Sequence, residues 1–243
     1  MQRRSTRLPA EPQPGAVPPP APPPPPPASS PPPAASLSGR QAEAARNDQL
    51  ILDAARAVFI ADPAAPVSEV AKRAGVGIAA LYRRYPSKED MLRKLCGDGL
   101  QRYIAEAEAA LADERDPWTA FTGFMDRVVT ADTHSLTQRL AGTFTPTEEL
   151  YREAARAQDL NVALVERVRG AGAIRPDVVV DDIAWMLEMV AAIRLRDAQR
   201  TGQLRQRYLA VLLDGLRGPA VPGSGPLPGP PPTGAEMGER WNT

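Results

Sequence analysis

The chain has 243 residues, with 29 basic and 29 acidic side chains. One histidine, His134, and one cysteine, Cys96, are too few for a zinc finger and leave no pair for a disulfide. No apolar run approaches the roughly 20 residues that a membrane-spanning helix needs. The basic start of the chain leads into prolines rather than an apolar signal segment. We therefore expect a cytoplasmic protein with no metal and no other cofactor.

Proline is concentrated at both ends of the chain. Fifteen of the 28 prolines precede residue 34, and seven follow residue 218. Proline fixes φ and lacks an N–H, so such stretches favour polyproline II over packed structure. We expect residues 1–39 and 219–243 to be disordered tails.

Charge is unevenly distributed along the chain. Residues 66–94 carry seven basic side chains against three acidic ones, and all three lysines lie there. Residues 104–218, in contrast, carry 14 arginines against 18 acidic side chains. A basic segment on an acidic body indicates a nucleic-acid footprint at one end of the molecule.

The spacing of apolar residues predicts an all-helical fold. A first helix over about 42–60 has two adjacent i, i+4 rows of apolar residues, which give it a broad buried face. Two short helices follow at about 67–73 and 77–83, with Gly75 between them. Ser87 is expected to cap a long helix over about 88–111.

Further helices are expected down to residue 217. Gly170 to Gly172 ends one of them, and Thr201-Gly202 is expected to separate the last two. The predicted spans are 117–131, 135–142, 146–170, 178–199 and 203–217.

The two short helices around Gly75 are spaced like a helix-turn-helix. Five small or apolar residues allow the helices to close over a shared core: Val70, Ala71, Ala74, Val76 and Leu81. In such a motif the second helix enters the major groove of DNA, and the first spans the backbone.

Residues 46–59 and 70–92 resemble the first helix, the helix-turn-helix and the fourth helix of TetR-type transcriptional regulators. The resemblance rests on the Gly75-Val76 turn, the Leu81-Tyr82 pair, the aromatic Tyr85 and the Ser-Lys-Glu run from residue 87. It covers about residues 44–103. It implies a three-helix DNA-binding domain at 40–103 and a helical ligand-binding and dimerisation domain at 104–218.

The resemblance also implies where DNA is bound. Tyr82 and Lys88 would contact phosphates on either side of the groove, and Tyr85 is interpreted as a packing residue. The predicted DNA contacts are Ser68, Lys72, Gly77, Ile78, Ala79, Ala80, Tyr82, Arg83, Arg84 and Lys88.

Two departures from the family pattern remove hydroxyl groups that could bind phosphate. Pro66 stands where the family often has Ser or Thr, and Ala79-Ala80 replaces a more polar pair. The recognition helix therefore offers few side-chain hydrogen bonds to bases. We infer that readout depends on Arg83 or Arg84 at guanine and on apolar contact with thymine methyl groups.

The last two predicted helices, 178–199 and 203–217, are each apolar on two faces. A helix of this kind is buried on two sides. One side would face its own core and the other a partner copy, giving a homodimer. The alternative is that both faces are interior to a single chain.

The resemblance implies an effector pocket between helices, lined mostly by apolar side chains. The candidates for its lining are Phe121, Phe124, Met125, Val128, Leu164, Val168, Trp185 and Met189. A wider set adds Trp118, His134, Leu140 and Phe144. We interpret His134 as an exposed or capping residue at a helix boundary, and Cys96 as a buried helix residue.

These observations together predict a ligand-responsive, sequence-specific regulator, most simply a homodimeric repressor of a palindromic operator with a small apolar effector. The alternative is a constitutive or architectural DNA-binding protein without an effector. An enzyme is not expected, because no nucleophile–base set, paired carboxylates or metal ligands stand at suggestive spacing. Asp181-Asp182 is better explained as the acidic first turn of a helix.

Overall fold

Helices make up the regular structure in the part of the chain that the computed structural model describes, residues 35–218 and 225–239. Within those ranges, extended pairing is limited to one isolated bridge between Ile174 and Arg217. None of the helices described there has the length and apolar character of a bilayer span. The all-α prediction is confirmed. The helices are α1 (Ala35–Ala61), α2 (Val67–Ala74), α3 (Ile78–Arg84), α4 (Lys88–Leu111), α5 (Pro117–Thr130), α6 (Thr133–Leu140), α7 (Glu148–Gly170), α8 (Val180–Ala192), α9 (Ala198–Leu216) and α10 (Gly234–Gly238).

Helix α1 begins at Ala35, seven residues before the predicted start. Residues 35–39 were expected in a disordered tail and are helical instead, because the last N-terminal proline is Pro33 and nothing after it breaks the helix. The rest of that tail, residues 1–34, lies outside the described residues. The boundary between two units of the chain falls within α1, between Gln41 and Ala42.

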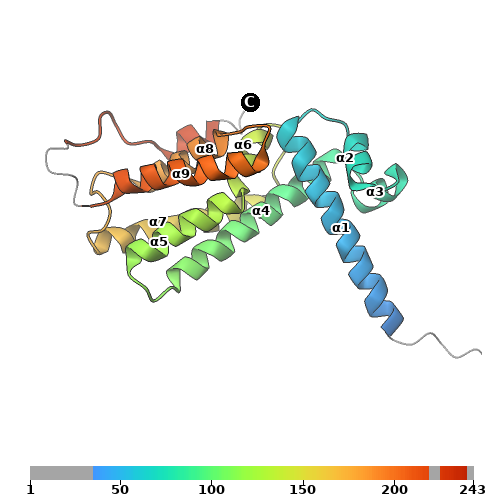
Figure 1. The fold of residues 1–243 in the computed structure, drawn as a ribbon, viewed down its shortest axis with the longest axis horizontal. Helices are drawn as coiled ribbons and strands as arrows, with labels where there is room; N and C mark the ends of the chain where they lie inside the picture. The colour runs from blue at the N-terminus through green and yellow to red at the C-terminus, as the bar shows by residue number, and fades with distance from the viewer. Residues whose placement is uncertain (1–34, 219–224, 240–243) are drawn as a thin grey trace, which may run out of the picture. The chain divides into compact units, whose positions relative to one another are not determined.

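Side chains from α1 to α4 and from α6 form one hydrophobic core, which we call the head cluster. Figure 1 labels the helices that supply them. Phe59, Leu81 and Met91 are fully buried in it. The head cluster consists of Ile51, Leu52, Ala54, Ala55, Phe59, Val67, Val70, Ala71, Leu81, Tyr85, Met91, Leu92, Leu95, Leu136 and Leu140.

The turn between α2 and α3 depends on a left-handed glycine. Gly75 has φ 69° and ψ 26°, a conformation that side chains beyond glycine adopt only at a cost. The N–H of Val76 then donates to the carbonyl oxygen of Ala71 at 3.0 Å, which satisfies one carbonyl at the end of α2. The next helix therefore starts at Ile78 in a new direction.

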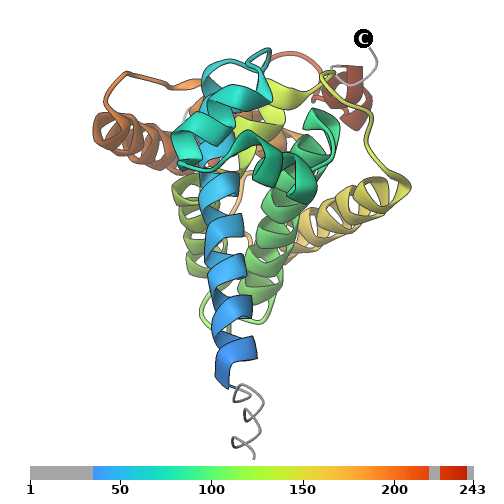
Figure 2. The ribbon, with the colours of Figure 1, turned by 90° about the vertical axis from the view of Figure 1, so that its right-hand side faces the viewer.

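A second core, the body cluster, is built from α4, α5, α7, α8 and α9 and the segment between α7 and α8. Figure 1 shows these helices as a bundle, and Figure 2 shows the same bundle from the side of α1 to α3. Helix α4 packs most extensively on α7 and also contacts α5 and α6. Four side chains of α4 belong to this second core: Tyr103, Ile104, Ala107 and Ala110.

The break between the last two long helices lies earlier than predicted. Helix α8 ends at Ala192, and α9 begins at Ala198, so Thr201-Gly202 lies inside α9. Asp197 caps α9 by accepting the N–H of Arg200 at 3.1 Å, a signal that the sequence interpretation missed.

Buried Arg205 of α9 closes the C-terminal end of α8. It donates to the carbonyl oxygens of Ala191 and Ile193 at 2.9 and 3.0 Å. It also donates to Asp132 Oδ1 at 2.6 Å and to Ser135 Oγ at 2.9 Å. A helix end that is buried needs such partners for its free carbonyls, so Arg205 joins α8, α9 and the start of α6.

Residues 225–239, which we call the C-terminal arm, are ordered where a disordered tail was expected. The N–H of Leu227 donates to Asp177 Oδ2 at 2.8 Å, and Thr233 caps the short helix α10. A proline-rich segment can dock as an extended chain when side chains elsewhere bond its carbonyl oxygens and its remaining N–H groups. Composition does not reveal such partners.

Two glycine substitutions test these turn assignments. Gly75→Ala is expected to lower the free energy of unfolding by about 1–2 kcal/mol, because its φ is positive and no neighbouring atom would contact the new methyl group. Gly202→Ala, also without a close neighbour, is expected to raise it by about 0.5–1 kcal/mol, because the residue is helical. Urea unfolding followed by circular dichroism measures both. A destabilising Gly202→Ala would contradict the continuous α9.

Candidate DNA-binding surface and effector cavity

Helix α3 presents one face to the head cluster and the other to solvent. Leu81 is fully buried, whereas Ile78 and Tyr82 are 42% and 48% exposed. Large apolar and aromatic side chains held in water on one short helix are available for contact with another surface. Arg83 lies on the exposed side as well.

The structure brings the ten predicted DNA contacts together on α2, the turn, α3 and the first residue of α4. Nine of them are exposed, and Lys88 is half-buried. The first residues of α2 and α3 have no side-chain cap, because Pro66 and Gly77 occupy the capping positions. Backbone N–H groups at these helix starts are thus not occupied by a capping side chain.

Arg84 is tied to α1. Its guanidinium donates to both carboxylate oxygens of Asp48, at 2.8 and 3.0 Å, and Tyr85 Oη donates to Asp48 Oδ1 at 2.7 Å. The Arg84 hydrogen bonds hold the pKa of Asp48 below its usual value. Burial, and then the bond to Asp48, raise the pKa of Tyr85. Tyr85 is buried, so its predicted packing role is confirmed.

Lys88 is also used inside the protein. Its ammonium donates to the carbonyl oxygens of Pro63 and Ala65 at 2.7 and 2.9 Å, and it lies 5.0 Å from the centre of the Phe59 ring. These contacts fix the loop before α2 against the start of α4. An ammonium has three N–H donors, and two of them are used here. Contact between Lys88 and a DNA phosphate remains a prediction, and at most one N–H can serve it without rearrangement.

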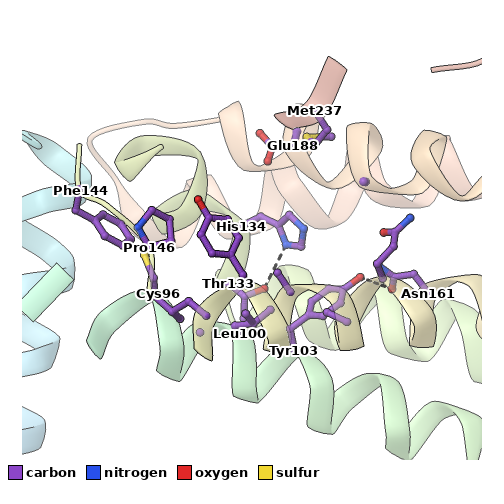
Figure 3. Close-up of a pocket in the computed structure, with 17 residues that line it drawn as sticks. Cys96, Leu100, Tyr103, Thr133, His134, Phe144, Pro146, Asn161, Glu188 and Met237 are labelled. Atoms are coloured by element: carbon purple, nitrogen blue, oxygen red, sulfur yellow. Dashed lines mark hydrogen bonds between the residues drawn. The ribbon is translucent and has the colours of Figure 1, made fainter. Parts of the chain in front are cut away.

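A cavity of about 360 Å³ lies between α4, α6, α7 and α8 (Figure 3). The volume is at the lower end of the range for small-molecule sites. Among the described residues, no cluster of histidine, cysteine and acidic side chains could hold a metal ion. The lining residues are Cys96, Gly99, Leu100, Tyr103, Thr133, His134, Phe144, Pro146, Leu150, Tyr151, Ala154, Ala157, Gln158, Asn161, Ala184, Glu188 and Met237.

None of the eight residues first predicted to contact the ligand lines this cavity. Six belong to the body cluster: Phe121, Phe124, Met125, Val128, Leu164 and Val168. Met189 is 53% exposed on α8, and Trp185 is half-buried. Periodicity identified the apolar faces but could not distinguish packed core from cavity wall, because both require the same residue types. Phe144, from the wider set, does line the cavity.

His134 lies in the first turn of α6, at the helix boundary that was predicted, but it is half-buried and lines the cavity, so the expectation of an exposed or capping residue is wrong. Asp132, two residues earlier, has a positive φ of 52°. The imidazole is half-buried and meets the Tyr103 ring edge-on, with 5.4 Å between ring centres. Polar residues near a turn are ambiguous in sequence, because the same types cap helices and line sites.

Two other polar side chains shape the cavity wall. Tyr103 Oη donates to Asn161 Oδ1 at 2.6 Å, and burial raises the pKa of the Tyr103 phenol (Figure 3). Cys96 is only partly buried, and desolvation raises the pKa of its thiol to about 12. The thiol is therefore neutral at physiological pH and packs as a small apolar group.

Helix α6 contributes to both the cavity and the DNA-binding end. Thr133 and His134 line the cavity, while Leu136 and Leu140 belong to the head cluster. Arg139 of α6 donates to the carbonyl oxygens of Ile60 and Ala61 at the end of α1, both at 3.1 Å. Arg194, after α8, also donates to Ile60, at 2.7 Å.

Helices α8 and α9 keep apolar side chains on an outer face. The inner stripe of α8, including Ile183 and Leu187, is buried in the body cluster. On the outer faces, Tyr208 and Val211 of α9 are 50% and 60% exposed, and Met189 of α8 is 53% exposed. Isolated exposed apolar residues are ordinary, but several on adjoining helices indicate an interaction surface.

Comparison with known proteins finds similarity in both parts of the chain. A family profile described as "Bacterial regulatory proteins, tetR family" matches residues 51–95. A second profile, "Transcriptional regulator SbtR-like, C-terminal domain", matches residues 116–218. The first range contains α2, α3 and their turn, and the second contains the helices of the body cluster from α5 onward.

Individual relatives are regulators of the same kind. The HTH-type transcriptional repressor LfrR of Mycolicibacterium smegmatis is 35% identical over 72 residues, which span 30% of this chain and 35% of the repressor. A TetR regulator from Mycobacterium vanbaalenii has a solved structure with 28% identity and a TM-score of 0.50, covering 73% of this chain and 98% of that one. The structure of LfrR in complex with proflavine has a TM-score of 0.56 at 23% identity, a likeness of fold, over 75% and 99% of the chains.

The two lysines at the DNA-binding end allow a matched test. Lys88→Met is expected to lower the free energy of unfolding by about 1.5–3 kcal/mol, because it removes two charged hydrogen bonds and leaves two carbonyls without them. Lys72→Met, on an exposed position, is expected to change it by less than about 0.5 kcal/mol. Equal stabilities of the two variants in urea titrations would contradict the structural role of Lys88.

Proposed function

The chain belongs to the TetR family of bacterial transcriptional regulators, a family of regulators rather than enzymes, and on that basis we propose that it is a ligand-responsive repressor. It acts in the cytoplasm as a homodimer on a near-palindromic operator. Residues 40–103 form its DNA-binding domain and residues 104–218 its effector and dimerisation domain. The observation that carries the proposal is that α6 supplies side chains to both the cavity and the core behind the recognition helix.

DNA binding is assigned to the exposed face of α2 and α3. Arg83 is the side chain that reads guanine, because Arg84 is already bound to Asp48 on α1. Tyr82, Lys72 and Ser68 contact the phosphate backbone and set the register of the helix on the groove. Ile78 and the neighbouring alanines supply apolar contact for thymine methyl groups.

Effector binding is assigned to the cavity, where a small and mostly apolar molecule is enclosed by aromatic side chains. A ligand can shift the protein only as far as it binds one conformer better than the other. Thr133 and His134 meet the ligand, and the same helix carries Leu136 and Leu140 into the head cluster. A small rotation of α6 therefore changes the packing behind α3 and the spacing of the two DNA-binding ends.

Homodimerisation is assigned to the outer faces of α8 and α9. Met189, Tyr208 and Val211 would be buried against the same faces of a second copy, which is the geometry of an isologous contact. A dimer of this kind places two recognition helices at successive major grooves, about one DNA turn apart or a little more.

Operator binding is tested first on DNA upstream of the protein's own gene, in gel-shift titrations at several salt concentrations. We expect a saturable shift that survives competitor DNA. Lys72→Ala should reduce the salt slope by about one unit at every sequence, because it removes a phosphate contact. Arg83→Ala should cost about 1–3 kcal/mol and relax the preference at one base pair. Arg84→Ala should leave base preference unchanged, because its guanidinium serves Asp48.

Two results of the gel-shift series would contradict the proposal. Shifts that disappear at modest salt for every DNA would indicate non-specific phosphate binding alone. Loss of base preference in Arg84→Ala, with Arg83→Ala unaffected, would place the base contact on the other arginine.

The dimer is tested with a charge placed on the outer face of α9. Val211→Glu is expected to weaken self-association by roughly a hundredfold, because it buries an unpaired carboxylate between two copies. Val162→Glu, at another exposed apolar position, on α7, is the control and should leave association unchanged. Sedimentation velocity over a concentration series measures both. Equal behaviour of the two variants would contradict the assigned interface.

A further inference from the structure

The C-terminal arm is anchored by two side chains that precede α8. Arg175 Nη2 donates to the carbonyl oxygen of Gly225 at 3.1 Å, and the N–H of Leu227 donates to Asp177 Oδ2 at 2.8 Å. Arg175 and Asp177 also form a two-pronged ion pair, at 2.9 and 2.8 Å. The start of the arm is therefore bonded to a preformed and partly buried charge pair.

The anchor is charged at neutral pH. The Arg175 side chain, and then the N–H of Leu227, hold the pKa of the Asp177 carboxyl at about 2. Arg175 is buried. Its two hydrogen bonds to the Asp177 carboxylate hold its guanidinium in one orientation. A charged acceptor gives a stronger hydrogen bond to a backbone N–H than a neutral one does.

The sequence of the arm suits docking as an extended segment. Five of its residues are prolines, which lose little conformational freedom when they are fixed. Gly229, with φ 79°, provides the turn. Thr233 and Glu236 then form a reciprocal capping box that starts α10, with bonds of 2.7 and 3.4 Å.

The arm follows α8 and ends at the cavity. A methyl group on Gly234 would lie 3.8 Å from Asp181 in the first turn of α8. Two turns further along α8, Met237 of the arm lies beside Glu188, and both line the cavity (Figure 3). Met237 carries the one large apolar side chain of α10, Gly234–Gly238.

We propose that the C-terminal arm is a strap that completes the effector cavity, held by Arg175 and Asp177, with Met237 as a residue that contacts the effector and limits its size. The proposal rests on the proposed function of the cavity as the effector site. The strap lies outside the residues that the two family profiles match, 51–95 and 116–218. The flexible thioether of Met237 adapts to apolar ligands of different shapes.

Docking of the strap is tested by amide hydrogen exchange in the full chain. The Leu227 amide is expected to be protected in the wild type and to exchange at least about tenfold faster in Asp177→Ala, which removes its acceptor. Asp159→Ala, an exposed acid on α7, is the control and should leave the protection unchanged. A Leu227 amide without protection in the wild type would overturn the strap.

The cavity wall is tested with a neutral apolar fluorophore, N-phenyl-1-naphthylamine. Met237→Ala and Asp177→Ala are each expected to weaken fluorophore binding by about tenfold. The first variant removes the apolar side chain itself, and the second releases the strap that carries it. Their affinity for operator DNA without ligand should not change. Wild-type affinity for the fluorophore in both variants would overturn the strap.

One further variant separates failure of the strap from failure of the effector site. Ala154→Trp, an exposed position at the rim of the cavity, is expected to abolish fluorophore binding by filling the space. If it does so while Met237→Ala has no effect, the effector site stands and the strap is wrong. If the wild type does not bind, or Ala154→Trp binds as well as the wild type, the cavity is not the effector site, and Met237 loses its proposed role with it.

Discussion

The continuity of α4 is the constraint on which the arrangement depends. Its first half packs Met91, Leu92 and Leu95 into the head cluster, and its second half packs Tyr103 and Ile104 into the body cluster. A helix of 24 residues is about 36 Å long and bends little without a proline or an inserted group. The cavity lies against the middle of α4, between the residues that this helix contributes to the two cores.

Two of the cationic side chains near the helix-turn-helix form bonds within the protein. Lys88 closes the loop before α2 against α4, and Arg84 fastens α3 to α1 through Asp48. These bonds fix the orientation of α3 in the absence of DNA. Less conformational entropy is therefore lost when DNA binds. Fewer cations are then left for the DNA contact that we propose, and it falls mainly to Lys72 and Arg83.

Sequence reasoning succeeded where one local signal decides the outcome. Ser87 capped α4 as predicted, and Gly75 made the turn between two short helices, because capping and positive φ depend on the residue itself. It failed where the outcome depends on tertiary context. Phe121 and Phe124 are core rather than cavity wall, and the proline-rich residues 225–239 are held by Asp177, nearly fifty residues earlier. No periodicity within a segment encodes a partner that distant.

The wall of the cavity is made of parts with different freedom to move. The side supplied by α4 and α7 is fixed by the body cluster, where Tyr103 is bonded to Asn161. The side supplied by α6 is strained at Asp132, whose positive φ is stabilised by Arg205 and whose carbonyl oxygen accepts from Arg56 of α1 at 3.2 Å. Local strain of this kind persists only when several bonds hold it. In the proposed function, a ligand that displaces α6 acts on a wall whose anchoring bonds also reach α1 and α9.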